Sequence, residues 1–441
     1  MHFFTEKCQQ YSPTPVSSLI HAATLVTAGV FLVARTSFIY EQTSNVLDFI
    51  AILGALTSFV ASTTGLVQND LKRVIAYSTC SQLGYMVFAC GLSNYSVGIF
   101  HLSNHAFFKA LLFLSAGSVI HGVNDEQDMR KLGGLKNLLP FTYSMMTIGS
   151  LALIGFPFLT GFYSKDLILE AAYGKYTLIG YFSYFLGTLG AFLTAFYSTR
   201  LLYLAFLAKP TGHKQIITFA GDSNIQICLA LGSLAIPSIF VGYYTKDMMV
   251  GVGSHFFGTA IYTSIASYNI FDAEFIPLFY KTLPVHFSLL GAFLAFVLYN
   301  FQANILYSLK TSFIGKKLYN FLNRKWFFDK VYNEYLGQFF FKFGYSVSYK
   351  FVDRGIFEIL GPTGLSSAAV LIGSSLHRLQ SGSIYHLTLT ILVGITMLFS
   401  LRQFSLIISL ADIYWLDYKL AVLIFISFLF LISYSENSEN D

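Results

Sequence analysis

Three ionisable residues at helical spacing stand out within an otherwise apolar segment. His101, His105 and Lys109 recur at every fourth position among Phe, Leu and Ala residues. Residues four apart share one face of an α-helix, so these side chains should line up along one helix. A charged group near the centre of a bilayer costs roughly 2.5 to 3.5 kcal/mol on insertion scales, so three of them indicate a function. Conduction of protons or ions is the first function to consider.

A lysine and an aspartate follow a predicted break in a second apolar stretch, residues 140–171. As one helix this stretch would be about 48 Å long, well beyond the ~30 Å hydrocarbon core of a bilayer. It contains Gly155 and Pro157, which interrupt helices, shortly before Lys165 and Asp166. Breaks within membrane helices mark ion sites in transporters, so the sequence predicts a broken helix with Lys165 beside the break.

Each of these residues has a chemical and a structural interpretation. Burial favours a neutral lysine and a nearby carboxylate favours the ammonium, so Lys165 suits a proton carrier. In the structural interpretation, Lys165 extends from a helix end to the membrane interface. Asp166 is the nearest countercharge in sequence, although adjacent helical side chains diverge by about 100° and need not pair. His101 and His105 suit a proton relay; they could also bind a metal, but no acidic or thiolate third ligand is near in sequence. Lys109 is either a central carrier or a polar anchor for packing.

The composition is that of an integral membrane protein. Of 441 residues, 55% are hydrophobic and only 11% are charged, whereas soluble domains carry roughly 25% charged residues. The four cysteines form no CxxC pair, so neither a disulfide framework nor a zinc site is indicated. The first residues lack the basic stretch and apolar core of a signal peptide, so we expect insertion where the chain is made.

Apolar runs of about 20 residues predict an all-α polytopic membrane protein with about ten transmembrane helices, one of them broken. They lie near residues 15–35, 46–68, 73–93, 96–120, 140–171, 176–207, 225–244, 285–307, 383–401 and 417–434. Lysines and arginines gather in alternate connections, within residues 72–73, 130–136, 209–214 and 310–317. By the positive-inside rule these connections face the compartment of synthesis, either the cytoplasm or the mitochondrial matrix.

Residues 318–382 differ from the predicted spans because charged residues recur among aromatic and aliphatic ones. This stretch is too charged to cross a membrane and too apolar to be a free loop. A lateral amphipathic helix on the positively biased side of the membrane fits the pattern, and it would reach up to about 95 Å. Gly361 and Pro362 should bend or interrupt it.

Four long motifs follow one another along the chain. They are Ser12–Val30 (SPTPVSSLIHAATLVTAGV), Asp70–Tyr85 (DLKRVIAYSTCSQLGY), His101–Leu114 (HLSNHAFFKALLFL) and Thr160–Asp166 (TGFYSKD). In order and spacing they resemble the antiporter-type subunits of respiratory complex I. Further blocks at Gly242–Met249, Lys325–Glu334 and Leu379–His386 are similar to the mitochondrial form of subunit 5, the most distal antiporter-like subunit. The resemblance extends from Ser12 to about Tyr434.

This resemblance implies two inverted repeats of five helices, each with a broken helix that carries a lysine. It implies proton translocation coupled to NADH:ubiquinone oxidoreduction, in the mitochondrial inner membrane, with the lateral helix on the matrix side. The implied proton pathway comprises His21, which would connect the two repeats, and His101, His105, Lys109, Lys165 and Asp166.

The resemblance also bears on cofactors and partners. The sequence has neither a Rossmann glycine fingerprint nor a cysteine set for iron–sulfur ligation, so we expect no cofactor and no metal in this chain. FMN, iron–sulfur clusters and ubiquinone are expected elsewhere in the complex. The expected partners are other membrane-arm subunits, especially neighbouring antiporter-like ones, and membrane lipids, but no nucleic acid.

The amino terminus departs from the family pattern. A complete subunit 5 has about seven helices before the PTPVS motif, and we expect a separate amino-terminal polypeptide to supply them rather than a reduced subunit. The expected organisation is a tail (1–14), a proton-translocation module (15–207), additional transmembrane helices (208–317), the lateral helix (318–382) and carboxy-terminal helices with an acidic tail (383–441).

Three other functions remain open from the sequence. The first is a stand-alone cation/proton antiporter or the related membrane hydrogenase subunit, which share these motifs but not the lateral segment. The second is a scaffold that does not conduct, against which the retained ionisable residues argue. The third is the plastid-type homologue, which the blocks at Lys325–Glu334 and Leu379–His386 make a weaker match.

Overall fold

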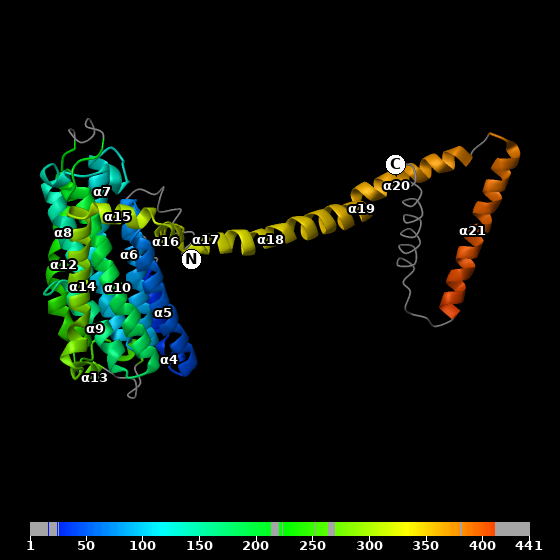
Figure 1. The fold of residues 1–441 in the computed structure, drawn as a ribbon. Coiled ribbons are helices and arrows are strands. Elements are labelled where there is room, and N and C mark those ends of the chain that lie inside the picture. The colour runs from blue at the N-terminus through cyan, green and yellow to red at the C-terminus, as the bar shows by residue number, and fades with distance from the viewer. Residues whose placement is uncertain are drawn as a thin grey trace. The chain divides into compact units, whose positions relative to one another are not determined.

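The computed structural model describes most of the chain as helices joined by short loops (Figure 1). The described residues are 16, 24, 26–212, 220–222, 224–251, 253–262, 270–379 and 382–410. No strand occurs within these ranges, which confirms the all-α prediction. The chain divides into two compact units, Met1–Asp329 and Lys330–Asp441, which are described separately. His21 and the predicted span 417–434 lie outside the described residues.

The first unit is a bundle of long helices around α7. Within it α7 packs against α3, α6, α8, α9 and α12, while α5 packs against α6 and α10, and α10 against α14. The ribbon shows these helices running side by side (Figure 1). The helices are α3 (Thr27–Arg35), α4 (Ser37–Tyr40), α5 (Ser44–Gly65), α6 (Leu71–Gly91), α7 (Tyr95–Gly122), α8 (Pro140–Ile154), α9 (Thr160–Gly174), α10 (Leu178–Leu202), α12 (Ile225–Val250), α13 (Ile270–Glu274), α14 (Leu278–Asn300), α15 (Ala303–Thr311) and α16 (Phe313–Asn323), with short turns η2 (Met129–Lys131), η3 (Leu135–Asn137), η4 (Tyr203–Leu207) and η5 (Gly258–Ala260).

The predicted helix break is confirmed between α8 and α9. Gly155 ends α8 in the left-handed region at φ 85°, a conformation that glycine adopts without steric cost. At Gly161 the two halves approach so closely that a Cβ atom would lie 1.7 Å from the carbonyl oxygen of Ala152. A side chain at position 161 would therefore push the two half-helices apart.

Seven helices in the described ranges are long and apolar enough to cross a membrane, and six match predicted spans. The six are α5, α7, α10 with η4, α12, α14 and α21 (Ile384–Leu410). The seventh is residues 325–378, whose 54 residues would measure about 81 Å, too long for a simple crossing. Three of the remaining predictions fall on described helices. The span predicted at 73–93 coincides with the 21-residue helix α6, which is not among the seven. Helices α8 and α9 are each too short alone, and α3 is described over nine residues only.

One predicted boundary is wrong. The span placed at 285–307 begins at Leu278 and ends at Asn300, and residues 303–307 belong to the separate helix α15. Pro284 lies inside α14, directly before the predicted start of the span. Membrane helices tolerate such a proline because neighbouring groups satisfy the freed backbone carbonyl.

The predicted lateral helix begins earlier than expected and is not continuous. Helix α16 starts at Phe313, and Lys325–Phe327 (η7) follow with positive φ values of 55° to 57°. From Phe328 to Leu360 the chain stays helical through α17 (Phe328–Lys330), η8 (Val331–Gly337), α18 (Gln338–Phe343), η9 (Gly344–Phe357) and α19 (Glu358–Leu360). Gly361 then departs from helical geometry, with φ −101° and ψ −134°, before α20 (Pro362–Leu379), which confirms the predicted interruption.

Candidate functional site

A group of ionisable side chains is buried in the middle of the bundle. His101, His105, Lys109 and Lys165 are each 0 to 1% exposed. The rings of His101 and His105 lie 6.1 Å apart, which confirms that they follow one face of α7. Lys109 continues this face and acts electrostatically on His105, while Lys165 approaches from α9 and acts on His101. The structure therefore brings these four sequence-predicted residues together.

His101 joins three helices through its ring. Its Nδ1 lies 2.8 Å from Ser164 Oγ on α9, and its Nε2 lies 3.1 Å from Gln82 Oε1 on α6. Because Gln82 presents its carbonyl oxygen, Nε2 donates to Gln82 and Nδ1 accepts from Ser164. The neutral imidazole thus has one donor and one acceptor engaged, the arrangement of a residue that can take a proton on one side and release one on the other.

His105 has a different environment. Within the described structure neither of its ring nitrogens has a hydrogen-bond partner, and the same holds for both side-chain polar atoms of Asn104. Its ring packs edge-on against Phe108 at 5.3 Å. Buried polar groups of this kind are rare in folded proteins and are typical of functional sites.

Both buried lysines contact neutral groups. Lys109 Nζ donates to the hydroxyl of Ser78 on α6. Lys165 Nζ donates to Thr194 Oγ1 at 3.0 Å and to the carbonyl oxygen of Ile154 at 3.3 Å, and it lies 5.5 Å from the centroid of the Tyr85 ring. Ile154 is the last residue of α8, so its carbonyl is one that the end of a helix leaves without a helical partner.

Asp166 does not form an ion pair with Lys165 in the described structure. The lysine contacts α8 and α10, while Asp166, only 9% exposed, has an Oδ2 atom for which no described residue is a partner. The two charges still act on each other electrostatically. This agrees with the divergence of adjacent side chains expected from the helix.

Sequence reasoning missed the neutral partners of these groups. Ser78 and Gln82 belong to the polar stretch of the Asp70–Tyr85 motif and Ser164 to the TGFYSKD motif, so their polarity within apolar helices was a usable signal. Thr194 and Ile154 carried no such signal, because only the tertiary packing brings them to Lys165.

Thr160 fixes the start of α9 against α12. Its Oγ1 donates to the carbonyl oxygen of Pro237 at 3.0 Å and accepts from the backbone N–H of Gly242 at 3.2 Å. Gly242 packs directly on Thr160, since a Cβ there would lie 2.7 Å from the Thr160 Cα. The start of α9, next to the break, is therefore attached to two backbone groups of α12.

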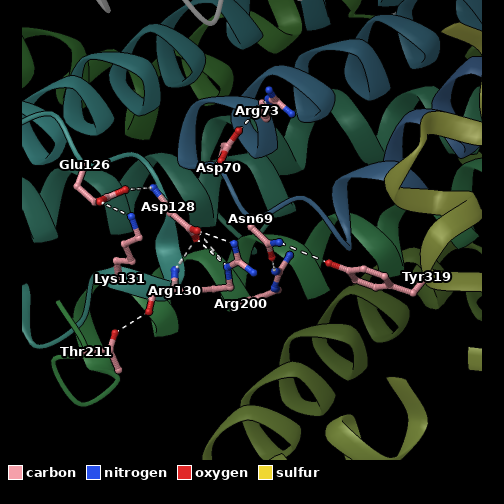
Figure 2. Close-up of polar contacts among 10 residues, drawn as sticks. All are labelled: Asn69, Asp70, Arg73, Glu126, Asp128, Arg130, Lys131, Arg200, Thr211 and Tyr319. Carbon is pink, nitrogen blue, oxygen red and sulfur yellow. Dashed lines mark hydrogen bonds and ion pairs between the residues drawn. The ribbon is translucent and has the colours of Figure 1, made fainter. Parts of the chain in front are cut away.

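Arg200 organises the polar loops at the end of the bundle that carries the clustered basic residues (Figure 2). Its guanidinium donates to the carbonyl oxygens of Leu66 and Gln68 at 2.6 and 2.8 Å, and to Asn69 Oδ1 at 3.0 Å. Asn69 in turn donates to the hydroxyl of Tyr319 on α16 at 3.5 Å. This network connects the α5–α6 loop, α10 and α16.

Ion pairs stabilise the neighbouring connections (Figure 2). Asp70 pairs with Arg73 at 2.8 Å and Asp128 with Arg130 at 2.6 Å. The hydrogen bonds from Arg130 hold the pKa of Asp128 below its usual value. Asp70 is the residue before the first turn of α6, and Arg73 lies within that turn.

A metal site was the alternative for the histidine pair. In the part of the chain that the structure describes, no group of three or more His, Cys, Asp or Glu side chains could hold a metal ion.

Comparison with known proteins gives the family context. Residues 1–194 match the family described as NADH:quinone oxidoreductase/Mrp antiporter, transmembrane, and residues 197–401 match the NADH dehydrogenase subunit 5 C-terminus. NADH-ubiquinone oxidoreductase chain 5 of Phytophthora infestans is 57% identical over 87% of this chain and 58% of its own length. The protein of the same name from Marchantia polymorpha is 53% identical over 95% of this chain and 62% of its own. The chain thus spans about 60% of the length of these relatives.

A solved structure shows a similar fold at lower sequence identity. The Mrp complex from Dietzia sp. DQ12-45-1b superposes with a TM-score of 0.53 at 19% identity, covering 89% of this chain and 38% of that chain. This likeness concerns the arrangement of helices alone.

Proposed function

Because this chain belongs to the family of NADH-ubiquinone oxidoreductase chain 5, we propose that it is a proton-translocating membrane-arm subunit of respiratory complex I. It is a multi-pass protein of the mitochondrial inner membrane. Its activity is to move protons while the complex transfers electrons from NADH to ubiquinone. The observation that carries this proposal is the continuous group of buried ionisable side chains, His101, His105, Lys109 and Lys165, whose described contacts are all with neutral groups.

The proposed pathway runs along α7 and then to α9. Lys109 and Lys165 are the carriers, and the two histidines relay protons between them. Neither ring nitrogen of His105 has a hydrogen-bond partner in the described structure, so a bridging water completes the transfer between the two histidines. The hydroxyls of Ser78, Ser164 and Thr194 can rotate to donate or accept, so they stabilise either protonation state of their partners. His21 is the proposed connection to a preceding repeat.

The driving reaction takes place elsewhere in the complex. FMN, iron–sulfur clusters and ubiquinone are proposed to be held by other subunits, and this chain contributes the membrane half of the coupling. In this assignment residues 15–207 form the translocation module, residues 208–317 add transmembrane helices, and residues 318–382 form the lateral helix.

The proposed partners are neighbouring antiporter-like subunits and membrane lipids. Mass spectrometry of the purified complex tests this proposal, because antiporter-like subunits should be recovered together with this chain. Purification without any of them would contradict it.

The test of the function uses the assembled complex in sealed vesicles. Lys109→Met should leave assembly near normal and lower the number of protons pumped per NADH oxidised, because methionine keeps the apolar stem and removes the protonatable group. His101→Phe should do the same while roughly keeping volume. Full pumping in both variants would favour the scaffold alternative. Sodium-dependent transport by the isolated chain would favour the stand-alone antiporter.

A further inference from the structure

A second set of charged residues leads from the buried site to the end of the bundle away from the basic loops. Asp166 and Glu170 lie one helical turn apart on α9, and their side chains therefore share a face. Exposure rises along this route: Asp166 is 9% exposed, the Glu170 side chain 14% and the Glu274 side chain 51%. The series connects the most buried part of the bundle with its surface.

Lys281 on α14 stands between the two outer carboxylates. Its Nζ lies 3.9 Å from Glu170 Oε2 and 3.1 Å from Glu274 Oε2. Lys246 on α12 also acts on Glu170 electrostatically. Since Lys281 is closer to the exposed glutamate than to the buried one, its position leaves Glu170 only partly compensated.

Aromatic packing fixes the start of α14 and thereby Lys281. Tyr280 stacks on Tyr173 of α9 with ring centroids 4.6 Å apart at an interplanar angle of 23°. The hydroxyl of Tyr184 on α10 donates to the carbonyl oxygen of Tyr280 at 2.7 Å. The lysine is therefore presented from a rigid position rather than from a free loop.

We propose that Glu170 is the carboxylate through which protons leave this subunit, receiving them from Lys165 through Asp166 and releasing them past Lys281 and Glu274. The proposal rests on the proposed function of the buried site and extends it to the route of release. The second observation that supports it is the Oδ2 atom of Asp166, which is buried and for which no described residue is a partner. A nine-tenths buried carboxylate with an open oxygen, between a lysine and a second carboxylate, is placed to accept a proton and pass it on.

The transfers balance at each step. The side chains of Lys165 and Asp166 are not in contact, so a bridging water carries the proton from the ammonium of Lys165 to the carboxylate of Asp166. This leaves a neutral amine and a carboxylic acid. The acid of Asp166 gives the proton to the carboxylate of Glu170, and Asp166 becomes anionic again. Glu170 then releases the proton to water at the surface and returns to its pairing with Lys281. No oxidant, reductant or cofactor is required.

The alternative role of Glu170 is structural, as one half of an ion pair that joins α9 to α14. The two roles predict different results when Glu170 and Lys281 are both replaced by neutral residues. Removing only one partner of a largely buried pair leaves an uncompensated charge, whereas removing both leaves none. A neutral pair should therefore restore assembly in either case but restore pumping only if the role is structural.

The experiment compares Glu170→Gln with Lys165→Met in the assembled complex, in sealed vesicles, by protons pumped per NADH. We expect Glu170→Gln to lose as much pumping as Lys165→Met at normal assembly, and Glu170→Asp to recover part of it. Glu334→Gln, an exposed glutamate on the long helix and outside the release route, is the control and should pump like the parent complex. If Glu170→Gln assembles poorly, the double variant Glu170→Gln/Lys281→Met should assemble and still fail to pump.

The outcomes separate the two proposals. Normal pumping by Glu170→Gln, or by the double variant, together with loss of pumping by Lys165→Met would overturn the release route and leave the proposed function in place. Normal pumping by Lys165→Met would overturn the proposed function itself, whatever Glu170→Gln does.

Discussion

The bundle and the long helix that follows it use the same charged residue types in opposite ways. In the bundle Lys109 and Lys165 are 0 to 1% exposed and donate to hydroxyl and carbonyl oxygens. In residues 330–360 Lys330 pairs with Glu334 at 3.6 Å and Arg354 with Glu358 at 3.9 Å. All four of these side chains are about half exposed or more.

The difference shows which charges have a functional reason to be present. Burying a charge without a strong countercharge costs several kcal/mol, so such residues persist only where the protein uses them. Exposed pairs one turn apart contribute only about 0.3 to 0.5 kcal/mol each. If the long helix attaches to other surfaces, its apolar residues must therefore supply most of the binding energy.

The largest effect is expected from a buried lysine compared with an exposed one. Lys165→Met should abolish or strongly lower proton pumping coupled to NADH oxidation, because it removes the protonatable group beside the helix break. Lys342→Met, on the exposed helix α18 (Gln338–Phe343), removes the same group without touching the buried site. The measurement is protons per NADH in sealed vesicles, alongside the amount of assembled complex. Equal pumping by both variants would show that the buried lysine is no more important for proton transfer than the exposed one.

A large effect of another kind is expected from shortening the long helix. Deleting residues 335–360 removes a broad exposed apolar surface, including Phe339, Phe340 and Phe341. If this surface attaches the subunit to neighbouring membrane-arm subunits, the deletion should release the subunit on mild detergent extraction. Native electrophoresis with subunit detection measures this. A truncated subunit that stays fully attached would leave the attachment role without support.

A moderate effect is expected at the helix break. Gly161→Ala places a Cβ against the carbonyl oxygen of Ala152, so the half-helices must separate. Overpacking of this kind typically costs about 1 to 3 kcal/mol. The matched control is Gly373→Ala in α20, where no atom lies within 4 Å of the new Cβ and alanine favours the helix. The unfolding temperature of the purified complex should be lower for Gly161→Ala and unchanged for Gly373→Ala. An unchanged unfolding temperature for Gly161→Ala would show that the break is loosely packed.

The smallest effect is expected from a single exposed pair. Lys330→Ala removes one ion pair whose partners are both 52% exposed. The free energy of unfolding should change by only about 0 to 1 kcal/mol. The subunit should stay in the complex during mild detergent extraction. Release of the subunit by this one substitution would mean that charge, rather than apolar contact, holds the long helix.

The sequence predicted those parts of the site that depend on local geometry. The four-residue spacing of His101 and His105 placed them on one face, and Gly155 with Pro157 predicted the break beside Lys165. The contacts of Lys165 with Thr194 and Ile154 were beyond sequence reasoning, because they depend on how α10 and α8 pack around α9.

The sequence predicted less where the backbone adopts positive φ values at residues other than glycine. Three consecutive residues, Lys325 to Phe327, adopt positive φ although none is glycine, so nothing in the sequence marked the turn between α16 and the long helix. The start of α14 was also missed. The helix begins at Leu278, directly after Pro277, and contains Pro284, whereas the span was predicted to begin seven residues later.

The broken helix also constrains how this chain enters the membrane during synthesis. With 15 residues each, α8 and α9 measure about 22 Å, so neither half can cross a ~30 Å core alone and both must be inserted as one event. The hydroxyl of Thr160 then lacks its final partners, Pro237 and Gly242, which are synthesised 77 and 82 residues later. At about 5 to 20 residues per second this interval lasts several seconds. The two half-helices therefore have to stay together through this interval by their own packing, before α12 is available to fix the start of α9.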